Sequence, residues 1–362
     1  MADPAPQLPK TKRRARWPYL LAAAAVLAVI SIKWLVPIAM EQRALAVIRA
    51  ECPDVGIENS SAPPPAPPTV ITGFRSLRAT LAMSIWKPTN LHAEYVGPDF
   101  LREWTGHEFL RVRTIEGSAN DLRPAADQLR WLQDVVDVEL YSVYDDDIEY
   151  VRHYTNLESL TLNTEITDTG QPCITDAGIS RLNSLFELRS LNLRDAHISG
   201  RGFATLSELD QLEELDLTHT QLTDDGLDHV CELSGLKSLQ FAGTRVTDDG
   251  LVHLKNLPRL ESLMLLGLPI TDNGLKHLSD LKQLKTLSLL ETKVTDAGLP
   301  YLLTLDNLED LDLSETKVTL DGVRQLHVLH NLRRLRLGGF GMTDAQRGEF
   351  QQALPGCKVT RY

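Results

Sequence analysis

The C-terminal half of the chain repeats one pattern of apolar residues every 24 positions. Each unit reads approximately (I/V)-T-D-x-G-L-x-x-L-x-x-L-x-x-L-x-x-L-x-L-x-x-T-x. A single unit of this length cannot bury its own leucines, so neighbouring units must stack and share a core. The pattern therefore predicts a solenoid. The first apolar position of successive units is occupied by Ile174, Ile198, Leu222, Val246, Ile270, Val294, Val318 and Met342.

Two leucines near the end of each unit predict a short strand. Leu263 and Leu265 are an example, and both should face the core because strand side chains alternate. Strands of successive units then pair in parallel. The residues that flank these leucines, such as Met264, should lie on the concave face of the resulting sheet.

The remaining positions of the unit predict a helix on the convex side. A threonine before an aspartate, as in Thr271 and Asp272, is a good N-cap. Thr247 occupies the same position. A glycine two residues after the aspartate indicates close backbone packing between turns. Leucines three residues apart, such as the run from Leu251 to Leu257, then extend the helix across the convex side.

Less regular segments flank the array. We expect an N-terminal cap at 41–113 that contains a proline-rich segment at 63–68, a short helix at 98–104 and a strand at 109–112. Degenerate repeats follow at 114–173, with strands at 138–140 and 160–162 and a loop at 166–173. Seven regular repeats occupy 174–341, and a C-terminal cap at 342–362 keeps inward contacts through Phe350, Leu354 and Val359.

Residues 17–40 form an apolar run that resembles one membrane span. As a helix, the 22 residues 19–40 of this run would be about 33 Å long, which suffices for a hydrocarbon core of roughly 30 Å. The basic segment 1–16 precedes this run, so the positive-inside rule predicts a cytoplasmic N-terminus and extracytoplasmic repeats at the cell membrane. The alternatives are a cleaved signal peptide and, for Lys12 to Arg14, a nuclear-localisation signal. A small-residue cleavage site directly after Met40 is absent, which favours a retained anchor.

The charge distribution argues against nucleic acid as the ligand. Residues 1–16 carry five basic residues and one aspartate, a net charge of +4, so the formal net charge of -12 leaves -16 on the remainder. The four cysteines are Cys52, Cys173, Cys231 and Cys357, and none is spaced as a zinc ligand. We expect free thiols, with Cys231 at an exposed helical position because Lys255 and Ser279 occupy that position in other units.

Residue spacing gives no support for a catalytic or metal site, and no cofactor is implied. His229, His253 and His277 recur at the repeat period on the convex helices, but no carboxylate shares their row. Asp145 to Asp147 lack the alternating spacing of a calcium loop, so a solvated turn is expected. The chain contains no G-x-S-x-G elbow, no phosphate-binding loop and no H-E-x-x-H motif.

These repeats resemble the leucine-rich repeat family, in the 24-residue T-x-(V/I)-T-D-x-G-L-x-x-L variety that is related to the repeats of F-box proteins. The basic N-terminus, single span, Gly-Pro-Asp-Phe-Leu at 97–101 and closing Ala-Leu-Pro-Gly-Cys at 353–357 make the whole chain similar to membrane-anchored leucine-rich repeat proteins of planctomycete bacteria. The resemblance implies an α/β horseshoe with a parallel concave sheet and convex helices. It also implies a protein-binding scaffold and names no partner.

The concave face offers one candidate binding site. Met264, Leu266 and Leu290 fall at positions that other units fill mostly with polar residues, and they should cluster as an apolar patch. The acidic residues expected around this patch are Asp216, Asp312, Glu291 and Glu315. Ordinary surface variation along a row of strands is the alternative explanation.

Three functions follow from these observations. The first is a single-pass membrane protein whose extracytoplasmic solenoid binds an unidentified protein or surface polymer through the apolar patch, without catalysis. The second is an F-box-like substrate receptor of a ubiquitin ligase, for which the preceding F-box helices are missing. The third is a structural envelope protein without a dedicated ligand.

Overall fold

The computed structural model describes residues 134–164, 174–339, 343–354 and 356–360, the segments 69–72, 90–95 and 110–119, and residues 43, 46 and 123. The predicted span 17–40, helix 98–104, proline-rich segment 63–68 and loop 166–173 lie outside the described residues, as do Cys52, Cys173 and Met342. Within the described part, no helix is both long enough and apolar enough to cross a membrane.

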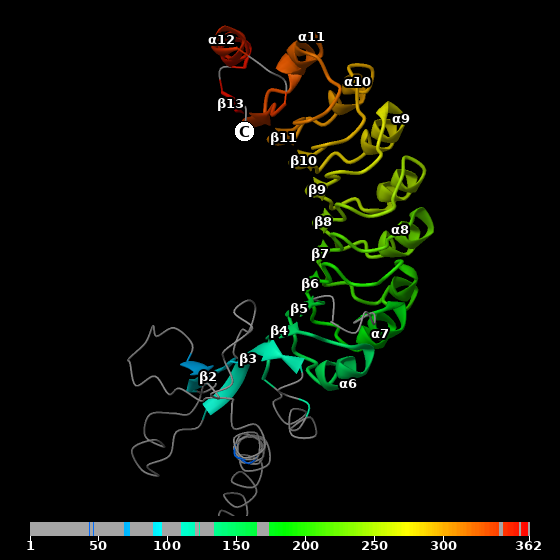
Figure 1. Cartoon of the computed structure of the whole chain (residues 1–362), viewed down its shortest axis with the longest axis vertical. Coiled ribbons are helices and arrows are strands. Elements are labelled where there is room, and N and C mark those ends of the chain that lie inside the picture. Colours follow the sequence, from blue (N-terminus) through cyan, green and yellow to red (C-terminus); the bar gives the residue numbers. More distant parts are fainter. Residues whose placement is uncertain are drawn as a thin grey trace, which may run out of the picture.

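The strands form one curved, open sheet that lines the concave side of a solenoid (Figure 1). Strands β1 to β3 pair antiparallel, and from β3 to β13 each strand pairs in parallel with the next. The strands are β1 (Thr69–Thr72), β2 (Asn90–Tyr95), β3 (Leu110–Ser118), β4 (Asp137–Tyr141), β5 (Ser159–Asn163), β6 (Ser190–Asn192), β7 (Glu214–Asp216), β8 (Ser238–Gln240), β9 (Ser262–Met264), β10 (Thr286–Ser288), β11 (Asp310–Asp312), β12 (Arg334–Arg336) and β13 (Lys358–Thr360).

The register of the sheet follows the sequence repeat. Leu263 of β9 lies beside Leu287 of β10, which lies beside Leu311 of β11. All three leucines are buried, and the core to which they belong extends from Ile115 to Val359. The predicted parallel concave sheet is therefore confirmed.

The convex side is built from short helical segments, labelled η where they are 3₁₀ helices (Figure 1). They are η3 (Asp145–Asp147), α6 (Ile148–Val151), α7 (Asp176–Ile179), η4 (Ser180–Leu182), η5 (Arg201–Thr205), α8 (Asp224–Val230), η6 (Gly250–Asn256), α9 (Asp272–Leu275), η7 (Lys276–Leu278), α10 (Leu299–Leu302), α11 (Leu320–Val323), η8 (Arg324–Val328) and α12 (Asp344–Ala353).

The leucine spacing of three explains why 3₁₀ geometry is so frequent. A 3₁₀ helix has three residues per turn, so residues three apart lie on the same face, whereas an α-helix rotates them apart. Leu251 and Leu254 of η6, and Leu257 just after it, are all buried. The prediction of regular convex helices was therefore too simple, because the same leucine spacing favours the tighter helix.

Aspartate side chains join most turns to the following one, and Gly200 and Leu320 replace the aspartate in two units. Asp272 accepts a hydrogen bond from the Thr295 backbone N–H at 2.8 Å and another from the Thr295 hydroxyl at 2.7 Å. We call this series of contacts the aspartate ladder. Its pairs are Asp145–Thr175, Asp176–Ser199, Asp224–Thr247, Asp248–Thr271, Asp272–Thr295 and Asp296–Thr319.

Most ladder threonines also act as N-caps. The Thr271 hydroxyl accepts from the Asn273 N–H, and the Thr319 hydroxyl accepts from the Gly322 N–H. Thr247 is an exception, because η6 begins at Gly250 with Asp249 at its N-cap position. The predicted cap at Thr247 is therefore wrong, and its hydroxyl serves the ladder alone.

The recurring glycine is explained by the ladder. A Cβ atom on Gly298 would lie 2.5 Å from the Asp272 carboxylate, and one on Gly322 would lie 2.0 Å from that of Asp296. The expected close packing is present, but its partner at these positions is the bonded aspartate of the previous turn. Glycine and aspartate therefore depend on one another across turns.

The C-terminal end is closed by α12 and β13. Thr343 and Gln346 form a capping box at the start of α12. Phe350, Leu354 and Val359 are buried, as predicted for the closing contacts. Gln351 donates a hydrogen bond to the Cys357 carbonyl at 2.7 Å, which ties the helix to the last strand.

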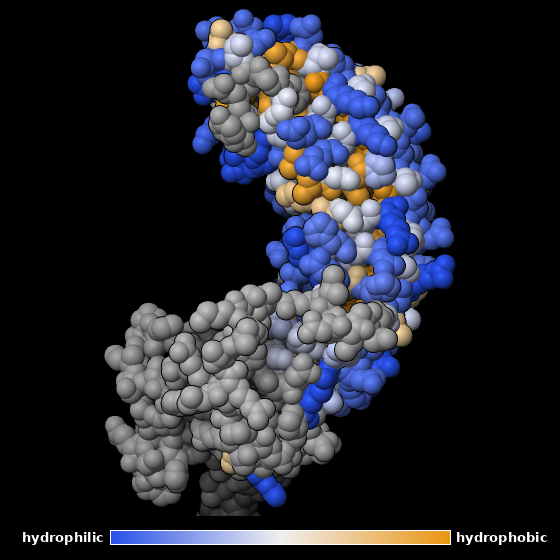
Figure 2. Space-filling model, viewed as in Figure 1, coloured by the Kyte–Doolittle hydropathy of each residue, from blue (hydrophilic) through white to orange (hydrophobic). Residues whose placement is uncertain are grey.

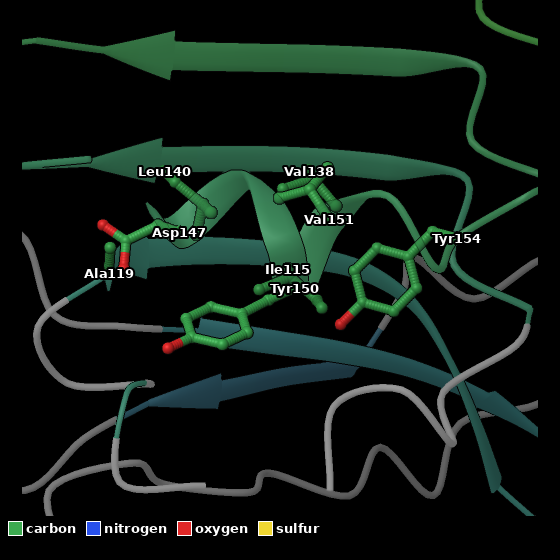
Figure 3. Close-up of a pocket in the computed structure, with 8 residues that line it drawn as sticks. All are labelled: Ile115, Ala119, Val138, Leu140, Asp147, Tyr150, Val151 and Tyr154. Atoms are coloured by element: carbon green, nitrogen blue, oxygen red, sulfur yellow. The ribbon is translucent and has the colours of Figure 1, made fainter. Parts of the chain in front are cut away.

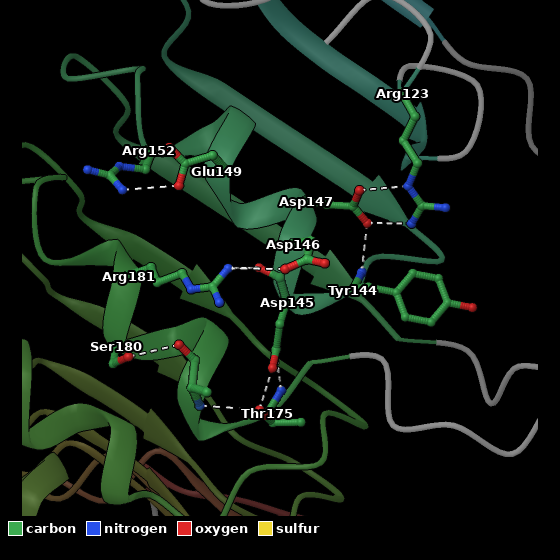
Figure 4. Close-up of polar contacts among 11 residues, drawn as sticks. Arg123, Tyr144, Asp145, Asp146, Asp147, Glu149, Arg152, Thr175, Ser180 and Arg181 are labelled. Carbon is green, nitrogen blue, oxygen red and sulfur yellow. Dashed lines mark hydrogen bonds and ion pairs between the residues drawn. The ribbon is translucent and has the colours of Figure 1, made fainter.

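The acidic run at the N-terminal end differs from the predicted solvated turn (Figure 4). Asp147 is buried and pairs with the Arg123 guanidinium at 2.6 Å, which raises the pKa of Arg123. Asp145 accepts from both the N–H and the hydroxyl of Thr175. Only Asp146 is fully exposed, where it approaches Arg181 at 3.5 Å. The first and third aspartates therefore secure the first turns of the array.

Both described cysteines, Cys231 and Cys357, are buried free thiols. The predicted exposure of Cys231 is wrong, since its exposed fraction is 1%. Its unit carries the seven-residue helix α8, whereas the equivalent Lys255 lies in a 3₁₀ helix, so the two residues face different directions. Burial raises the pKa of both thiols, that of Cys357 to about 11, and this keeps them protonated at neutral pH.

Candidate functional site

The concave face presents parallel rows of side chains that cross the strands. In the first row, which precedes the buried leucine of each strand, β7 to β12 carry Glu214, Ser238, Ser262, Thr286, Asp310 and Arg334. In the second row, which follows that leucine, they carry Asp216, Gln240, Met264, Ser288, Asp312 and Arg336. The third row lies two residues beyond the second and holds Thr218, Ala242, Leu266, Leu290, Ser314 and Gly338.

The predicted apolar residues are half-buried neighbours on this face. Met264 and Leu266 belong to one turn, and Leu290 occupies the next turn in the same row as Leu266. The two turns are held in register because the Leu265 N–H donates to the Ser288 carbonyl and the Gly267 N–H donates to the Leu290 carbonyl, both at 2.9 Å. Figure 2 shows hydrophobic residues reaching the concave edge in the region of β9 and β10. We call Met264, Leu266 and Leu290 the apolar patch.

The four acidic residues predicted around the patch have different environments. Glu291 and Glu315 are exposed. Asp216 is half-buried and accepts from the Thr218 N–H at 2.8 Å. Asp312 is 8% exposed, accepts from the Ser314 N–H at 2.9 Å and lies 3.7 Å from the Arg336 guanidinium. Glu291 and Glu315 are therefore the acidic side chains most accessible to a partner.

Glu291 and Glu315 also adopt an unfavourable backbone conformation. Their φ angles are 58° and 54°, and the equivalent residues Gly243 and Gly267 have φ angles of 66° and 71°. This left-handed region costs a residue with a Cβ atom about 1 kcal/mol. Asp195 and His219 adopt the same conformation at the equivalent position of earlier units, with φ angles of 62° and 61°. The strain therefore belongs to this turn of the repeat and does not single out the two glutamates.

Two arginines cover buried carboxylates at the C-terminal end of the face. Arg334 and Arg336 both approach one oxygen of Asp310, at 2.8 and 3.2 Å. Asp310 is 4% exposed, and its other carboxylate oxygen has no partner within the described structure. The Arg334 side chain is 63% exposed. The carboxylates therefore lie beneath the two arginine side chains, and the guanidinium groups face the solvent.

A row of alternating charges lies at the N-terminal ends of the strands, one residue before the first row. The distances between side-chain nitrogen and carboxylate oxygen are 2.9 Å for Glu213–Lys237, 2.6 Å for Glu261–Lys285 and 3.3 Å for Glu309–Arg333. We call it the charged row. Its members in chain order are Glu158, Arg189, Glu213, Lys237, Glu261, Lys285, Glu309 and Arg333. The charged row neutralises itself and so offers little net charge to a ligand.

One small cavity lies under the first turns (Figure 3). Its volume is about 10 Å³, which is room for a single water molecule. It is lined by Ile115, Ala119, Val138, Leu140, Asp147, Tyr150, Val151 and Tyr154. Burial raises the pKa of Tyr154, whose hydroxyl has no hydrogen-bond partner among the described residues. The cavity is too small for an organic ligand.

The three periodic histidines are placed on the convex side as predicted, and two of them lie near carboxylates. His253 lies 2.7 Å from Asp228 of the previous turn, and His229 lies 3.4 Å from Glu232. These carboxylates occupy other repeat positions than the histidines, so they are neighbours that the comparison of equivalent positions does not reveal. In the described part of the chain, no three histidine, cysteine or acidic side chains are grouped as metal ligands.

Sequence reasoning missed the aspartate ladder and the charged row. The charged row was visible as an alternation of sign at one repeat position. The ladder was hidden because N-capping already explained each threonine, so its contact with the preceding turn left no separate signal.

Comparison with known proteins identifies the repeat. A family model described as a leucine-rich repeat matches residues 212–231, which include β7 and α8. No match was found among curated proteins. Among solved structures, internalin C2 of Listeria monocytogenes is 25% identical, with a TM-score of 0.44, over 61% of this chain and 84% of that chain.

Two further structures show the same level of similarity. Internalin F of Listeria monocytogenes is 18% identical, with a TM-score of 0.43, over 73% of this chain and 94% of that chain. A leucine-rich repeat protein of Leptospira interrogans is 18% identical, with a TM-score of 0.40, over 64% of this chain and 80% of that chain. The sequence match thus identifies residues 212–231, one turn of the solenoid, as a leucine-rich repeat.

Proposed function

We propose that this protein is a non-catalytic scaffold that binds a partner protein on its concave face, through the apolar patch of Met264, Leu266 and Leu290. The residues predicted to surround the contact are Asp216, Asp312, Glu291 and Glu315. Scaffolds of stacked repeats offer extended concave surfaces of this kind for binding.

The carrying observation is the contrast between the apolar patch and the rest of its rows. At the equivalent positions, β7 carries Asp216 and Thr218, and β11 carries the buried Asp312 and Ser314. Half-exposed apolar side chains cost solvation free energy that a partner recovers by covering them. Glu291 and Glu315 are exposed near the patch, so their carboxylates are accessible to a bound partner.

We further propose that residues 17–40 anchor the chain in the cell membrane, with the N-terminus in the cytoplasm and the repeats outside it. The apolar run and the preceding basic residues support this orientation. This orientation can be measured with a reporter enzyme that is fused after Tyr362 and is active on only one side of the membrane. Activity on the cytoplasmic side would refute the orientation and favour the ubiquitin-ligase alternative.

The binding site is tested by substituting Met264→Asp together with Leu266→Asp. A photo-crosslinking residue at the exposed position of Gly267 traps the partner in intact cells, and the adduct is measured by immunoblot. The double substitution should reduce the adduct at least tenfold, because it places two charges where an apolar surface would be covered. Circular dichroism should remain that of the parent chain, since both side chains are only half-buried.

The matched control is Asn192→Asp with Arg194→Asp, at the same two row positions on the turn of β6. This control should leave the adduct unchanged. An adduct that persists in the Met264 and Leu266 variant, or that is lost equally in both variants, would place the binding site elsewhere.

A further inference from the structure

Charge changes sign along the concave face. In the first two rows, β4 carries Asp137 and Glu139 and β7 carries Glu214 and Asp216, with no lysine or arginine at any first-row or second-row position from β4 to β11. The first cations of these rows appear on β12, as Arg334 and Arg336. The acidic and basic ends therefore lie on opposite sides of the apolar patch.

The charges at the basic end are available to a partner. The Arg334 side chain is 63% exposed above the buried Asp310. Lys358 follows Arg334 in the first row on β13, is exposed, and forms no ion pair within the described residues. In the first two rows, three cations against the two buried carboxylates Asp310 and Asp312 leave this end with a net charge of +1. The exposed Glu315 lies beside these rows, next to Gly339 of the β12 turn.

The acidic end is available as well. Glu214 is exposed, and among the described residues its carboxylate accepts one hydrogen bond, from the Ser190 hydroxyl at 3.3 Å. The charged row runs beside both ends but alternates in sign, so it does not cancel the difference between them. Arg194, the nearest cation of the third row, lies 3.5 Å from Asp195 and is thereby neutralised.

The separation of the two ends sets a length for the ligand. Five strand spacings separate β7 from β12, which at about 4.8 Å each amounts to roughly 24 Å. An extended peptide spans about 3.4 Å per residue, so roughly seven residues cover this distance. Between the two ends, the second row passes Gln240, Met264 and Ser288, with the apolar patch near the middle.

We propose that the partner segment is an extended peptide that lies across the strands, with basic side chains over β7, apolar side chains on the patch, and acidic side chains over β12 and β13 about seven residues away. This inference rests on the proposed function and specifies its ligand. Opposite charges at the two ends align the segment, and the apolar patch supplies the contact area.

The test uses a fluorescent synthetic probe with the sequence Lys-Lys-Ser-Leu-Ser-Leu-Ser-Glu-Glu and the full chain in mild detergent. Fluorescence anisotropy measures binding. A second probe, Glu-Glu-Ser-Leu-Ser-Leu-Ser-Glu-Glu, has the same apolar centre but carries no basic end. The parent chain should bind the first probe at least threefold more tightly than the second.

Charge exchange in the protein provides the decisive comparison. Glu214→Lys should weaken binding of the first probe and strengthen binding of the second, each about threefold to tenfold, because it reverses an exposed charge opposite the probe. The second effect is a gain, so misfolding cannot produce it. Lys358→Glu should weaken both probes. Arg334 and Arg336 are left unchanged because they neutralise the buried Asp310.

Three results would overturn the proposal. They are no binding of either probe, equal binding of both probes, and equal effects of Glu214→Lys on both. The proposed function fails separately, when Met264→Asp with Leu266→Asp leaves the cellular adduct intact. If that adduct is lost but the probes do not distinguish the charges, the patch binds a partner of different chemistry.

Discussion

At the scale of single residues, the aspartate of each repeat has a role that extends beyond its own turn. Asp176 illustrates this role, since it accepts hydrogen bonds from the N–H groups of Ser199, Gly200 and Gly202 and from the Ser199 hydroxyl. All four donors belong to the following unit. The carboxylate therefore satisfies backbone groups that would otherwise need water at the junction between turns.

The dependence between ladder aspartate and glycine predicts a measurable coupling. Asp272→Ala removes two hydrogen bonds and should lower the free energy of unfolding by about 1–3 kcal/mol. Gly298→Ala should also destabilise, because its Cβ would lie 2.5 Å from the Asp272 carboxylate. The double variant should be destabilised by about 1 kcal/mol less than the sum of the two single effects, because removal of the Asp272 carboxylate makes room for the added Cβ. Urea unfolding measures all three.

The control for this cycle is Gly348→Ala in α12, where an added Cβ meets nothing within 4 Å. There the better helix propensity of alanine should stabilise the chain by about 1 kcal/mol. Additive effects at Asp272 and Gly298 would show that the glycine is required for another reason.

Asp176 also predicts a pH dependence of stability. Partial burial raises its pKa, but the bonds from Ser199, Gly202 and Gly200 outweigh this effect and hold the pKa below its usual range. A depressed folded pKa stabilises the fold at pH values above the unfolded pKa, and the contribution is lost as pH falls through the folded pKa, from about pH 5 downward. Asp176→Asn should therefore differ most from the parent near pH 7 and progressively less on acidification.

Thermal unfolding between pH 3 and pH 7, as approximate limits, measures this difference within the range in which carboxylates titrate. Asp146→Asn is the control, because Asp146 is exposed and its one ion pair is long at 3.5 Å. A constant difference between Asp176→Asn and the parent at all pH values would contradict the prediction.

Which residues could be predicted depended on whether their role lies within one unit. Leu263 and Met264 were assigned to opposite faces because alternation along a strand is local and repeats at every turn. Cys231 was misplaced because the residues at the same repeat position, Lys255 and Ser279, belong to units whose convex segments contain 3₁₀ helices. Asp147 was misplaced because its partner, Arg123, lies 24 residues away outside the regular array.

At the scale of elements, the strands and the convex segments respond to different sequence signals. Each strand is defined by two leucines and by its neighbours in the sheet, and its position followed from the repeat. The convex segments vary from α8, an α-helix, to η6, a 3₁₀ helix, although the leucine spacing is the same. The spacing of three favours a 3₁₀ helix, and packing against adjacent turns decides which units, such as that of α8, depart from it.

The charged row predicts that its alternation contributes to stability. Lys237→Glu would place three carboxylates in succession, at positions 213, 237 and 261. It should destabilise the chain at low salt, with most of the effect removed near 1 M salt by screening. Lys237 also lowers the pKa of Glu213 through their hydrogen bond, so the substitution should raise that pKa.

Lys255→Glu is the matched control, since Lys255 is exposed on η6 outside the row. Urea unfolding at two salt concentrations measures both variants. Equal effects of the two substitutions would show that the alternation is incidental to stability.

At the scale of the whole molecule, the ladder connects turns unequally. Leu320 stands where an aspartate would reach Thr343, and Thr343 instead bonds to Gln346 of its own helix. The closing segment of α12 and β13 therefore joins the array through apolar contacts, strand pairing and the exposed Arg324–Glu349 ion pair at 3.3 Å, without a ladder bond. In a solenoid, each turn is stabilised mainly by its neighbours, so this junction should open before the junctions that a ladder pair joins.

Hydrogen exchange followed by mass spectrometry tests this order. Backbone amides of α12 and β13 should exchange faster than those of β9 and β10, whose turns are joined by the Asp248–Thr271 and Asp272–Thr295 pairs. Equal protection at the two places would mean that the ladder does not set local stability.

The architecture as a whole was more predictable than the binding site. A 24-residue repeat requires stacking, and stacking of strand-forming leucines requires a parallel sheet. The apolar patch was predicted from three residues that break the polar pattern. The separation of charge between Glu214 and Arg334 was not predicted from the sequence. It appears only when residues 120 positions apart are aligned by the register of the sheet.

The charged row also constrains how an array like this one can change in length. Removing one 24-residue unit, such as the one that carries Lys237, would bring Glu213 beside Glu261. Removing two consecutive units would leave opposite charges adjacent. With respect to these charges the modular element of the solenoid is a pair of turns, so insertions and deletions that preserve the alternation come in steps of 48 residues.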